Sequence, residues 1–263
     1  MNGAFMTEVD VLSIDGNRKG GMELPGIFTE SVRPELILRA VIAENTMRLQ
    51  PQGHYPLAGM QTSATYYGAM NSYRTGRHMG IAIRPREKLG GGVQGRVRRI
   101  PSSVTGKRAH PHVVEKRIVE RINREEYRRA LESAVAATVS KETMKPLVVS
   151  NELESIKRTK DMIRAIRAVK LGGELDSVRP RTRKGLSRGS SRRGYSKRVL
   201  IVLSRECEAV RAARNIAGVD VCAVGRISAN LLAPGGRPGR AAIWSEAAVS
   251  AVQGAIDRIR IGG

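Results

Sequence analysis

The fold of this 263-residue chain is decided by the stretch VLIVL at residues 199–203, which holds five consecutive apolar side chains. An uninterrupted apolar run of this length is typical of a strand that is buried on both faces of a sheet. Two more apolar strands are predicted downstream, at Val219 to Val224 and at Ala241 to Trp244, and a helix is predicted over Glu206 to Asn215. This alternation predicts an α/β fold in which a mainly parallel sheet is covered by helices.

The alternation of strands and helices continues upstream of this run. Leu147 to Val149 is predicted as a short strand, and Ser155 is predicted to open a helix. The apolar face of that helix consists of Met162, Ile163, Ile166 and Val169. Asn123 is followed three residues later by Glu126, which resembles a capping box and predicts an Ala-rich helix through about Val139. These segments extend the same α/β pattern.

Both ends of the chain carry elements of this pattern. Thr7 to Ile14 alternates polar and apolar residues before Asp15-Gly16, which predicts a strand that enters a turn or hairpin. Pro34 is predicted at the first position of a helix. Ser245 is predicted to cap a final helix that packs through Ala248, Val252, Ile256 and Ile259. Because aromatic residues make up 3% of the chain, the core must be aliphatic.

Positive charge is concentrated in two segments. Asn45 to Val114 holds eleven Lys or Arg and one carboxylate, Glu87, and Arg179 to Arg198 holds nine basic residues and no acid. The segments contribute +10 and +9 of the net charge of +22, which leaves +3 for the other 173 residues. The longer segment is rich in glycine and has no hydrophobic periodicity, so order requires a polyanion that supplies counter-charge. The sequence therefore predicts a long, extended, basic internal loop that binds nucleic acid.

The predicted contact residues carry guanidinium, ammonium, imidazole or phenol groups. Arginine outnumbers lysine by nine to two and seven to two in the two segments, and its planar fork matches phosphate oxygens and stacks on bases. Tyrosine rings can stack on unpaired bases, although ordinary packing is the alternative for each ring. The predicted contacts are Arg48, Tyr55, Tyr66, Tyr67, Tyr73, Arg74, Arg77, His78, Arg84, Arg86, Lys88, Arg96, Arg98, Arg99, Lys107, Arg108, His110, His112, Arg181, Arg183, Lys184, Arg188, Arg192, Arg193 and Lys197.

One further basic stripe lies outside the two segments. Lys157, Lys160, Arg164 and Arg167 fall on one face of the helix predicted to begin at Ser155. Such a stripe is either a solvated face or a further RNA contact, and the sequence leaves both interpretations open.

The sequence lacks the motifs that would indicate a nucleotide cofactor, and its carboxylates do not favour an enzyme. No G-x-G-x-x-G follows a strand and no G-x-x-x-x-G-K-[ST] occurs, so no nucleotide cofactor is predicted. Glu152 and Glu154 follow one predicted strand, and Glu206 and Glu208 follow another. The first turn of a helix favours acidic residues, so a structural role is preferred over acid-base catalysis.

Metal binding and membrane association are also not supported. Cys207 and Cys222 have no CxxC partner, and the pair His110 and His112 lacks a third ligand. No apolar stretch approaches the ~18 residues of a membrane helix, and a signal peptide is not predicted. We therefore expect a soluble intracellular protein with no metal, no cofactor, no membrane partner and no small-molecule substrate.

Seven short motifs follow one another along the chain. They are YPLAG at 55–59, TGR at 75–77, QGRVRRIP at 94–101, GKRAHPH at 106–112, RNIAGV at 214–219, LAPGGRPGR at 232–240 and IWSE at 243–246. Together they resemble one known family, the universal large-subunit ribosomal protein four in its archaeal and eukaryotic form. The resemblance covers nearly the whole chain, and the short segment after the final helix favours an archaeal source.

The resemblance implies a structural constituent of the cytoplasmic large ribosomal subunit that is not an enzyme. Residues 1–49 and 113–263 would form a globular α/β domain on large-subunit rRNA, and residues 50–112 a loop that penetrates the rRNA. The loop tip, with Arg77, His78, Arg84 and Arg86, would help to line the peptide exit tunnel. Expected partners are rRNA and neighbouring ribosomal proteins. A free RNA-binding regulator and an α/β enzyme that acts on RNA remain the alternatives, although no base-reading motif is visible.

Overall fold

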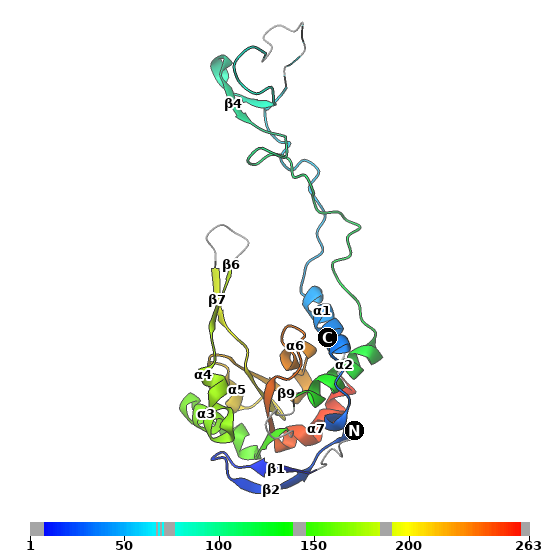
Figure 1. The fold of residues 1–263 in the computed structure, drawn as a ribbon, viewed down its shortest axis with the longest axis vertical. Helices are drawn as coiled ribbons and strands as arrows, with labels where there is room; N and C mark the ends of the chain where they lie inside the picture. Colours follow the sequence, from blue (N-terminus) through cyan, green and yellow to red (C-terminus); the bar gives the residue numbers. More distant parts are fainter. Residues whose placement is uncertain are drawn as a thin grey trace. The chain divides into compact units, whose positions relative to one another are not determined.

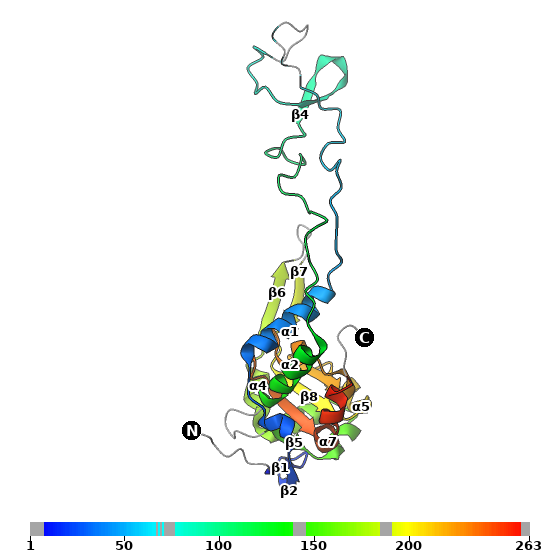
Figure 2. The same cartoon turned by 90° about the vertical axis from the view of Figure 1, so that its right-hand side faces the viewer.

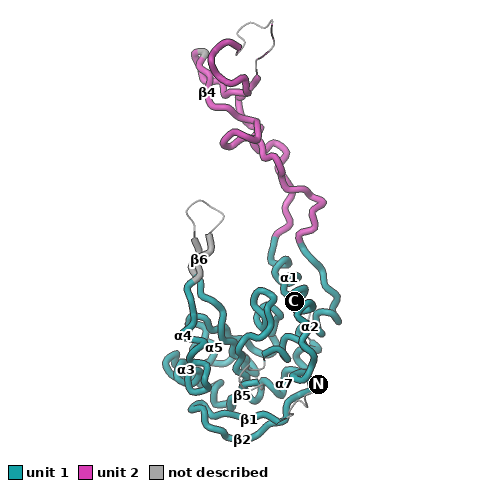
Figure 3. Tube along the Cα trace, viewed as in Figure 1, with its two compact units in different colours: residues 1–49, 119–263 teal, residues 50–118 magenta. Residues whose placement is uncertain are grey.

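The computed structural model describes residues 8–66, 68, 70, 77–138, 146–184 and 191–258, with the backbone alone for 181–184 and 191–193. Two units divide the chain (Figure 3): unit 1 is residues 1–49 with 119–263, and unit 2 is residues 50–118. Unit 1 contains the central sheet with its helices, and unit 2 contains most of the longer basic segment.

Within the described residues, the sheet of unit 1 has six strands, of which five run parallel. The sixth strand, β2 (Arg18–Glu23), pairs antiparallel with β1 (Glu8–Leu12) as the predicted hairpin, and Gly16 in its turn has a φ of +84°. This arrangement confirms the predicted α/β class (Figure 1). From edge to edge the strands are β2 (Arg18–Glu23), β1 (Glu8–Leu12), β5 (Leu147–Val149), β10 (Ala241–Ser245), β8 (Val199–Leu203) and β9 (Val219–Ala223).

Strand β8 is buried along its whole length, which explains its uninterrupted apolar sequence. Leu200 and Val202 face one hydrophobic cluster, and Ile201 faces the other on the opposite side of the sheet. The neighbouring β10 alternates in the same way, with Trp244 on the first side and Ile243 on the second. Helices must therefore cover both faces.

The two faces of the sheet are covered by different helices (Figures 1 and 2). Helices α1, α2, α6 and α7 contribute to the cluster around Trp244, and α3 and α5 contribute to the cluster around Ile243. The helices are α1 (Pro34–Met47), α2 (Arg124–Ala136), α3 (Thr159–Ile166), α4 (Gly172–Asp176), α5 (Glu208–Ala213), α6 (Ala229–Leu232) and α7 (Glu246–Ile256). Shorter helical turns are η1 (Gly26–Thr29), η3 (Asn151–Ser155), η4 (Arg167–Leu171) and η5 (Val224–Arg226).

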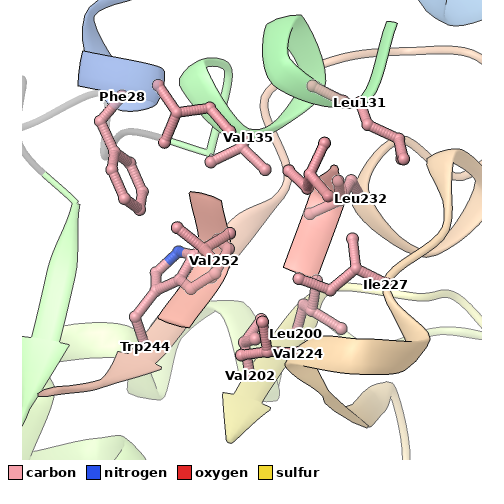
Figure 4. Close-up of a cluster of buried hydrophobic side chains, with 14 of the residues drawn as sticks. Phe28, Leu131, Val135, Leu200, Val202, Val224, Ile227, Leu232, Trp244 and Val252 are labelled. Atoms are coloured by element: carbon pink, nitrogen blue, oxygen red, sulfur yellow. The ribbon is translucent and has the colours of Figure 1, made fainter. Parts of the chain in front are cut away.

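Trp244 belongs to the first cluster, in which Figure 4 shows it next to Val252 and below Phe28. Its side chain is fully buried, and the ring of Phe28 meets it edge to face at a centroid distance of 5.2 Å. Val135 of α2 and Val252 of α7 belong to the same cluster. Apart from Phe28, Trp244 and Tyr127, the buried residues of this cluster are aliphatic or small, as the composition predicted.

The predicted start of the helix at Ser155 is wrong. Ser155 ends the 3-10 helix η3, where its hydroxyl donates to the backbone oxygen of Glu152 at 2.7 Å. Serine hydroxyls compete for local carbonyls in this way, and α3 begins instead at Thr159 after Arg158. Of the four predicted face residues, Ile163 is only half-buried, whereas the other three are buried.

The capping box predicted at Asn123 does not form, although α2 begins where the sequence indicated. The Asn123 side chain makes no capping hydrogen bond, and the Glu126 carboxylate instead pairs with Arg39 of α1 at 2.7 Å. Ser245 does cap α7, because its Oγ accepts a hydrogen bond from the backbone N–H of Ala248 at 3.2 Å. The predictions for Thr7, Val139 and Ile259 lie outside the described residues.

The carboxylate of Glu154, in η3, joins the C-terminal ends of β8 and β10. The backbone N–H and the hydroxyl of Ser204 each donate to it at 2.8 Å, and the Ser245 hydroxyl donates at 2.7 Å. Burial of the Glu154 carboxyl group raises its pKa, but these hydrogen bonds outweigh burial. The pKa of Glu154 is therefore lowered from its ordinary value of 4.5.

Glu154→Gln is expected to lower the free energy of unfolding by about 1–3 kcal/mol at neutral pH, because the side-chain NH2 group would face hydrogen-bond donors. Since the folded state holds the pKa of Glu154 below 4.5, the stabilisation is complete above that pH and is lost as pH falls through the folded pKa. Chemical denaturation between neutral and acidic pH measures both effects. The control is Glu206→Gln, at an exposed carboxylate beyond β8. An E154Q protein that keeps the parent's pH dependence would contradict this role.

Candidate nucleic-acid interface

Unit 2 contains a small antiparallel hairpin that the sequence did not predict. Strands β3 (Arg86–Lys88) and β4 (Gln94–Val97) pair around the turn η2 (Gly90–Gly92), and Thr65 bridges to Arg86 on the other side. Gly91 has a φ of +73°, a conformation that glycine adopts without strain. The signal was the glycine run itself, because short segments that flank a glycine-containing loop are typical of a hairpin.

Apolar burial contributes little to unit 2. Within the described part of residues 50–118, Ala64 is the only buried hydrophobic residue. Ile83, Val93 and Val104 are 50%, 60% and 83% exposed. A unit of this size without a larger core cannot offset its conformational entropy by apolar burial.

Arginine side chains supply many of the internal hydrogen bonds of unit 2. Arg98 is 18% exposed; its Nε donates to Glu87 at 2.7 Å and its guanidinium also donates to the Val104 carbonyl at 2.8 Å. Arg99 donates to the carbonyl of Thr62 at 3.1 Å. Arg77 and Arg86 are likewise half-buried and donate to backbone carbonyls. The side chains of these four predicted contact residues therefore form hydrogen bonds that stabilise the backbone of the unit.

The other predicted contact residues whose side chains are described are exposed. Several of them also make one internal hydrogen bond, as Tyr55 does when its hydroxyl accepts from Gln61 at 2.6 Å. Their side chains are therefore accessible to solvent. The exposed set is Arg48, Tyr55, Tyr66, His78, Arg84, Lys88, Arg96, Lys107, Arg108, His110, His112 and Lys197.

The second basic segment forms a hairpin in unit 1, with β6 (Pro180–Lys184) paired to β7 (Ser191–Tyr195). Its register places Arg183 directly opposite Arg192, and like charges at opposed positions destabilise a strand pair. The side chains of Arg181, Arg183, Lys184, Arg192 and Arg193 are not described, and Tyr67, Tyr73, Arg74 and Arg188 lie outside the described residues.

The base of this hairpin is tied to a buried arginine that the sequence did not single out. Arg240 has a side chain that is 2% exposed and donates to the Val199 carbonyl and to Asp220, each at 2.8 Å. Burial lowers the pKa of Arg240, and Asp220 opposes that effect. Asp220 also pairs with Lys197 at 3.2 Å, so one carboxylate links the core to the hairpin base.

The carboxylates considered for acid-base chemistry are all engaged in structural contacts, as expected. Besides the hydrogen bonds of Glu154, Glu152 pairs with Lys19 at 2.7 Å and Glu208 pairs with Lys157 at 3.0 Å. Glu206 pairs with Arg226. These contacts support the structural interpretation of the four acids.

Cys207 and Cys222 are free thiols. Burial raises the pKa of Cys222 to about 12, which leaves the thiol protonated and unreactive at neutral pH. Among the described residues, no group of three or more His, Cys, Asp or Glu is arranged to hold a metal ion. The same part of the chain has no helix of the length and apolarity needed to cross a membrane.

Glu44, near the C-terminal end of α1, joins α1 to α2 and α6. Its carboxylate accepts from the Tyr127 hydroxyl of α2 at 2.7 Å, and from the backbone N–H groups of Ala229 and Asn230 at 2.6 and 3.0 Å. Burial and the nearby Glu44 charge raise the pKa of Tyr127, which keeps its hydroxyl a donor. The sequence signal was a carboxylate in line with the apolar face of α1, after Val41.

Comparison with known proteins gives a consistent result. Residues 22–255 match the family described as the Ribosomal protein L4/L1 family. Three similar archaeal proteins are each named large ribosomal subunit protein uL4. That of Archaeoglobus fulgidus is 39% identical over 252 residues, which cover 91% of this chain and 95% of the relative. That of Methanococcus vannielii is 40% identical over 256 residues (92% and 96%), and that of Methanospirillum hungatei 38% identical over 258 residues (94% and 99%).

Glu44→Gln is expected to lower the free energy of unfolding by about 1–3 kcal/mol, because an amide cannot accept all three hydrogen bonds of the carboxylate. Denaturant unfolding measures the change. The matched control is Glu35→Gln, an exposed acid on the same helix, which should alter stability little. Equal stabilities of the two variants would show that the Glu44 contacts contribute nothing.

Proposed function

The chain belongs to the ribosomal protein L4/L1 family, and on this premise we propose that its basic segments bind large-subunit rRNA. Family membership identifies a structural protein of the large ribosomal subunit, which acts in the cytoplasm as part of that particle and is not an enzyme. Its partners are therefore rRNA and other ribosomal proteins. Particular exposed residues would make the RNA contacts, and each unit would have its own role in the particle.

One observation carries the proposal of rRNA binding: unit 2 has exposed cations and, in its described part, one small buried apolar residue. A segment of this kind gains order when phosphate groups neutralise its charge and release their condensed counterions. The half-buried arginines of unit 2 already bond its own backbone, so the exposed residues are the proposed phosphate and base contacts. Exposed Tyr55 and Tyr66 offer rings for stacking on unpaired bases.

The two units are proposed to have different roles in rRNA binding. Residues 1–49 and 113–263 would bind the surface of the rRNA and support subunit assembly. Residues 50–112 would penetrate the rRNA, with Arg77, His78, Arg84 and Arg86 near the wall of the peptide exit tunnel. Support for this division comes from the separation of residues 50–118 as a unit of its own. Of the four tip residues, His78 and Arg84 are exposed and could face the tunnel.

Sedimentation of native cell extract tests whether the chain is an integral part of the particle. The chain is expected to sediment with the large subunit at low salt and to remain there after a high-salt wash, because cations embedded in folded rRNA exchange slowly. A chain that a high-salt wash releases would be a peripheral factor. Recovery at the top of the gradient at both salt concentrations would instead favour a free RNA-binding regulator.

Replacement of residues 50–112 by a short Gly/Ser linker tests the division between the units. The variant is expected to keep the secondary structure and cooperative unfolding of unit 1 but to fail in subunit assembly. The logarithmic salt slope of its rRNA binding should be smaller by about 0.7–0.9 for each phosphate group that the loop no longer neutralises. A full-length variant with the loop cations changed to Gln separates the effect of charge from that of chain length. Unfolding of the linker variant would refute the independence of unit 1.

A further inference from the structure

A second concentration of positive charge lies on unit 1, away from both basic segments. Residues 157–170 and 205–214 together hold nine Lys or Arg and three carboxylates. They belong to the 173 residues whose net charge is +3, so the rest of those residues carry a net charge of −3. The local excess of +6 is therefore hidden by the average.

Helical periodicity places four of these cations on one outer surface, which we call the α3/α5 patch. On α3, Met162 and Ala165 are buried against the sheet, so Lys160 and Arg164 point outward. On α5, the alanines at 209, 212 and 213 are buried, which turns residues 211 and 214 outward. The two helices pack against each other over the same face of the sheet (Figure 1). The patch consists of Lys160, Arg164, Arg211 and Arg214.

The four side chains of the α3/α5 patch are exposed and form no ion pair with any residue that the structure describes. Two adjacent cations are already neutralised, because Lys157 pairs with Glu208 at 3.0 Å and Arg167 pairs with Asp176 at 3.5 Å. The only carboxylate of α3 is Asp161, and it makes no ion pair with the patch within the described residues. The positive charge of the patch is therefore available to a ligand.

The opposite helical layer carries both paired and unpaired cations. Arg128 of α2 pairs with Glu125 and Glu132, at 3.1 and 3.2 Å. The outer side of α7 presents the neutral residues Ser250 and Gln253. On the same side, Arg124 and Arg129 of α2 are exposed and make no ion pair within the described residues, so the α3/α5 patch is distinguished by the clustering of its cations on two packed helices.

We propose that the α3/α5 patch is a further RNA-binding surface, which takes backbone phosphate groups of large-subunit rRNA without reading base sequence. The inference rests on the proposed rRNA binding. Three of the four patch residues are arginines, whose fork matches phosphate oxygens. Arg205 adds a fifth exposed cation beside the patch. From α3 the chain continues through η4 and α4 directly into the basic hairpin β6–β7, so the RNA would contact one continuous stretch of the domain.

The test compares two full-length variants with the same change in net charge. The patch variant is Lys160→Gln, Arg164→Gln, Arg211→Gln and Arg214→Gln. The matched control is Arg18→Gln, Lys19→Gln, Arg128→Gln and Arg226→Gln, four cations of unit 1 that each pair with a carboxylate. Affinity for deproteinised large-subunit rRNA is measured over a series of salt concentrations, with thermal unfolding as the check on folding.

The patch variant is expected to bind the rRNA on the order of tenfold or more weakly at low salt, with a logarithmic salt slope smaller by about 2 to 4. The control should stay close to the parent chain. Equal weakening of both variants would mean that only net charge matters, and no weakening of either would mean that the patch faces solvent; each result overturns the inference. Failure of the parent chain itself to bind would instead overturn the proposed function.

Two double variants keep the test decisive if the fourfold patch variant is unstable. Lys160→Gln with Arg164→Gln changes α3 alone, and Arg211→Gln with Arg214→Gln changes α5 alone. Each is expected to show about half of the decrease in salt slope. A decrease confined to one helix would limit the surface to that helix and overturn the proposal of a joint α3/α5 surface.

Discussion

Strand β8 buries every one of its side chains, and this requirement for cover on both faces of the sheet determines the rest of unit 1. One face is closed by α1, α2 and α7, and the other by α3 and α5. The first layer contains the two helices that precede and follow unit 2 in the chain. The second layer presents unpaired cations on its outer side. Burial of one apolar strand thus requires both helical layers.

Unit 2 is held by a different kind of interaction. Where unit 1 uses apolar burial, unit 2 uses guanidinium groups that donate to carbonyl oxygens and to Glu87. Each of these hydrogen bonds contributes a modest net free energy, because the same groups bond to water in the unfolded chain. In the described part of unit 2, His78, Arg99 and Thr105 also have positive φ values, which adds conformational cost. Both features favour a segment that gains its order from a partner.

The sequence predicted the strands better than the contacts that join them. Apolar runs such as 147–149 and 199–203 coincide with β5 and β8, because a strand buried on both faces leaves little ambiguity. Glu126 and Ser155 were misassigned because their partners, Arg39 and a local carbonyl, depend on geometry that spacing does not contain. For the candidate interface, the sequence located the cations, but it could not separate Arg98, which bonds within its unit, from the exposed Arg96.

The order of the strands has a consequence for synthesis of the chain. Strand β10 is the last to be made, yet it pairs with β5 on one side and with β8 on the other. Until residues 241–245 emerge from a translating ribosome, β2-β1-β5 and β8-β9 are two partial sheets, each with an unpaired edge. During that interval the nascent chain has already exposed its cationic segments, before its domain can close. A newly made molecule therefore needs protection from two kinds of contact. One is strand pairing with other chains, and the other is non-specific binding of its basic segments to other polyanions.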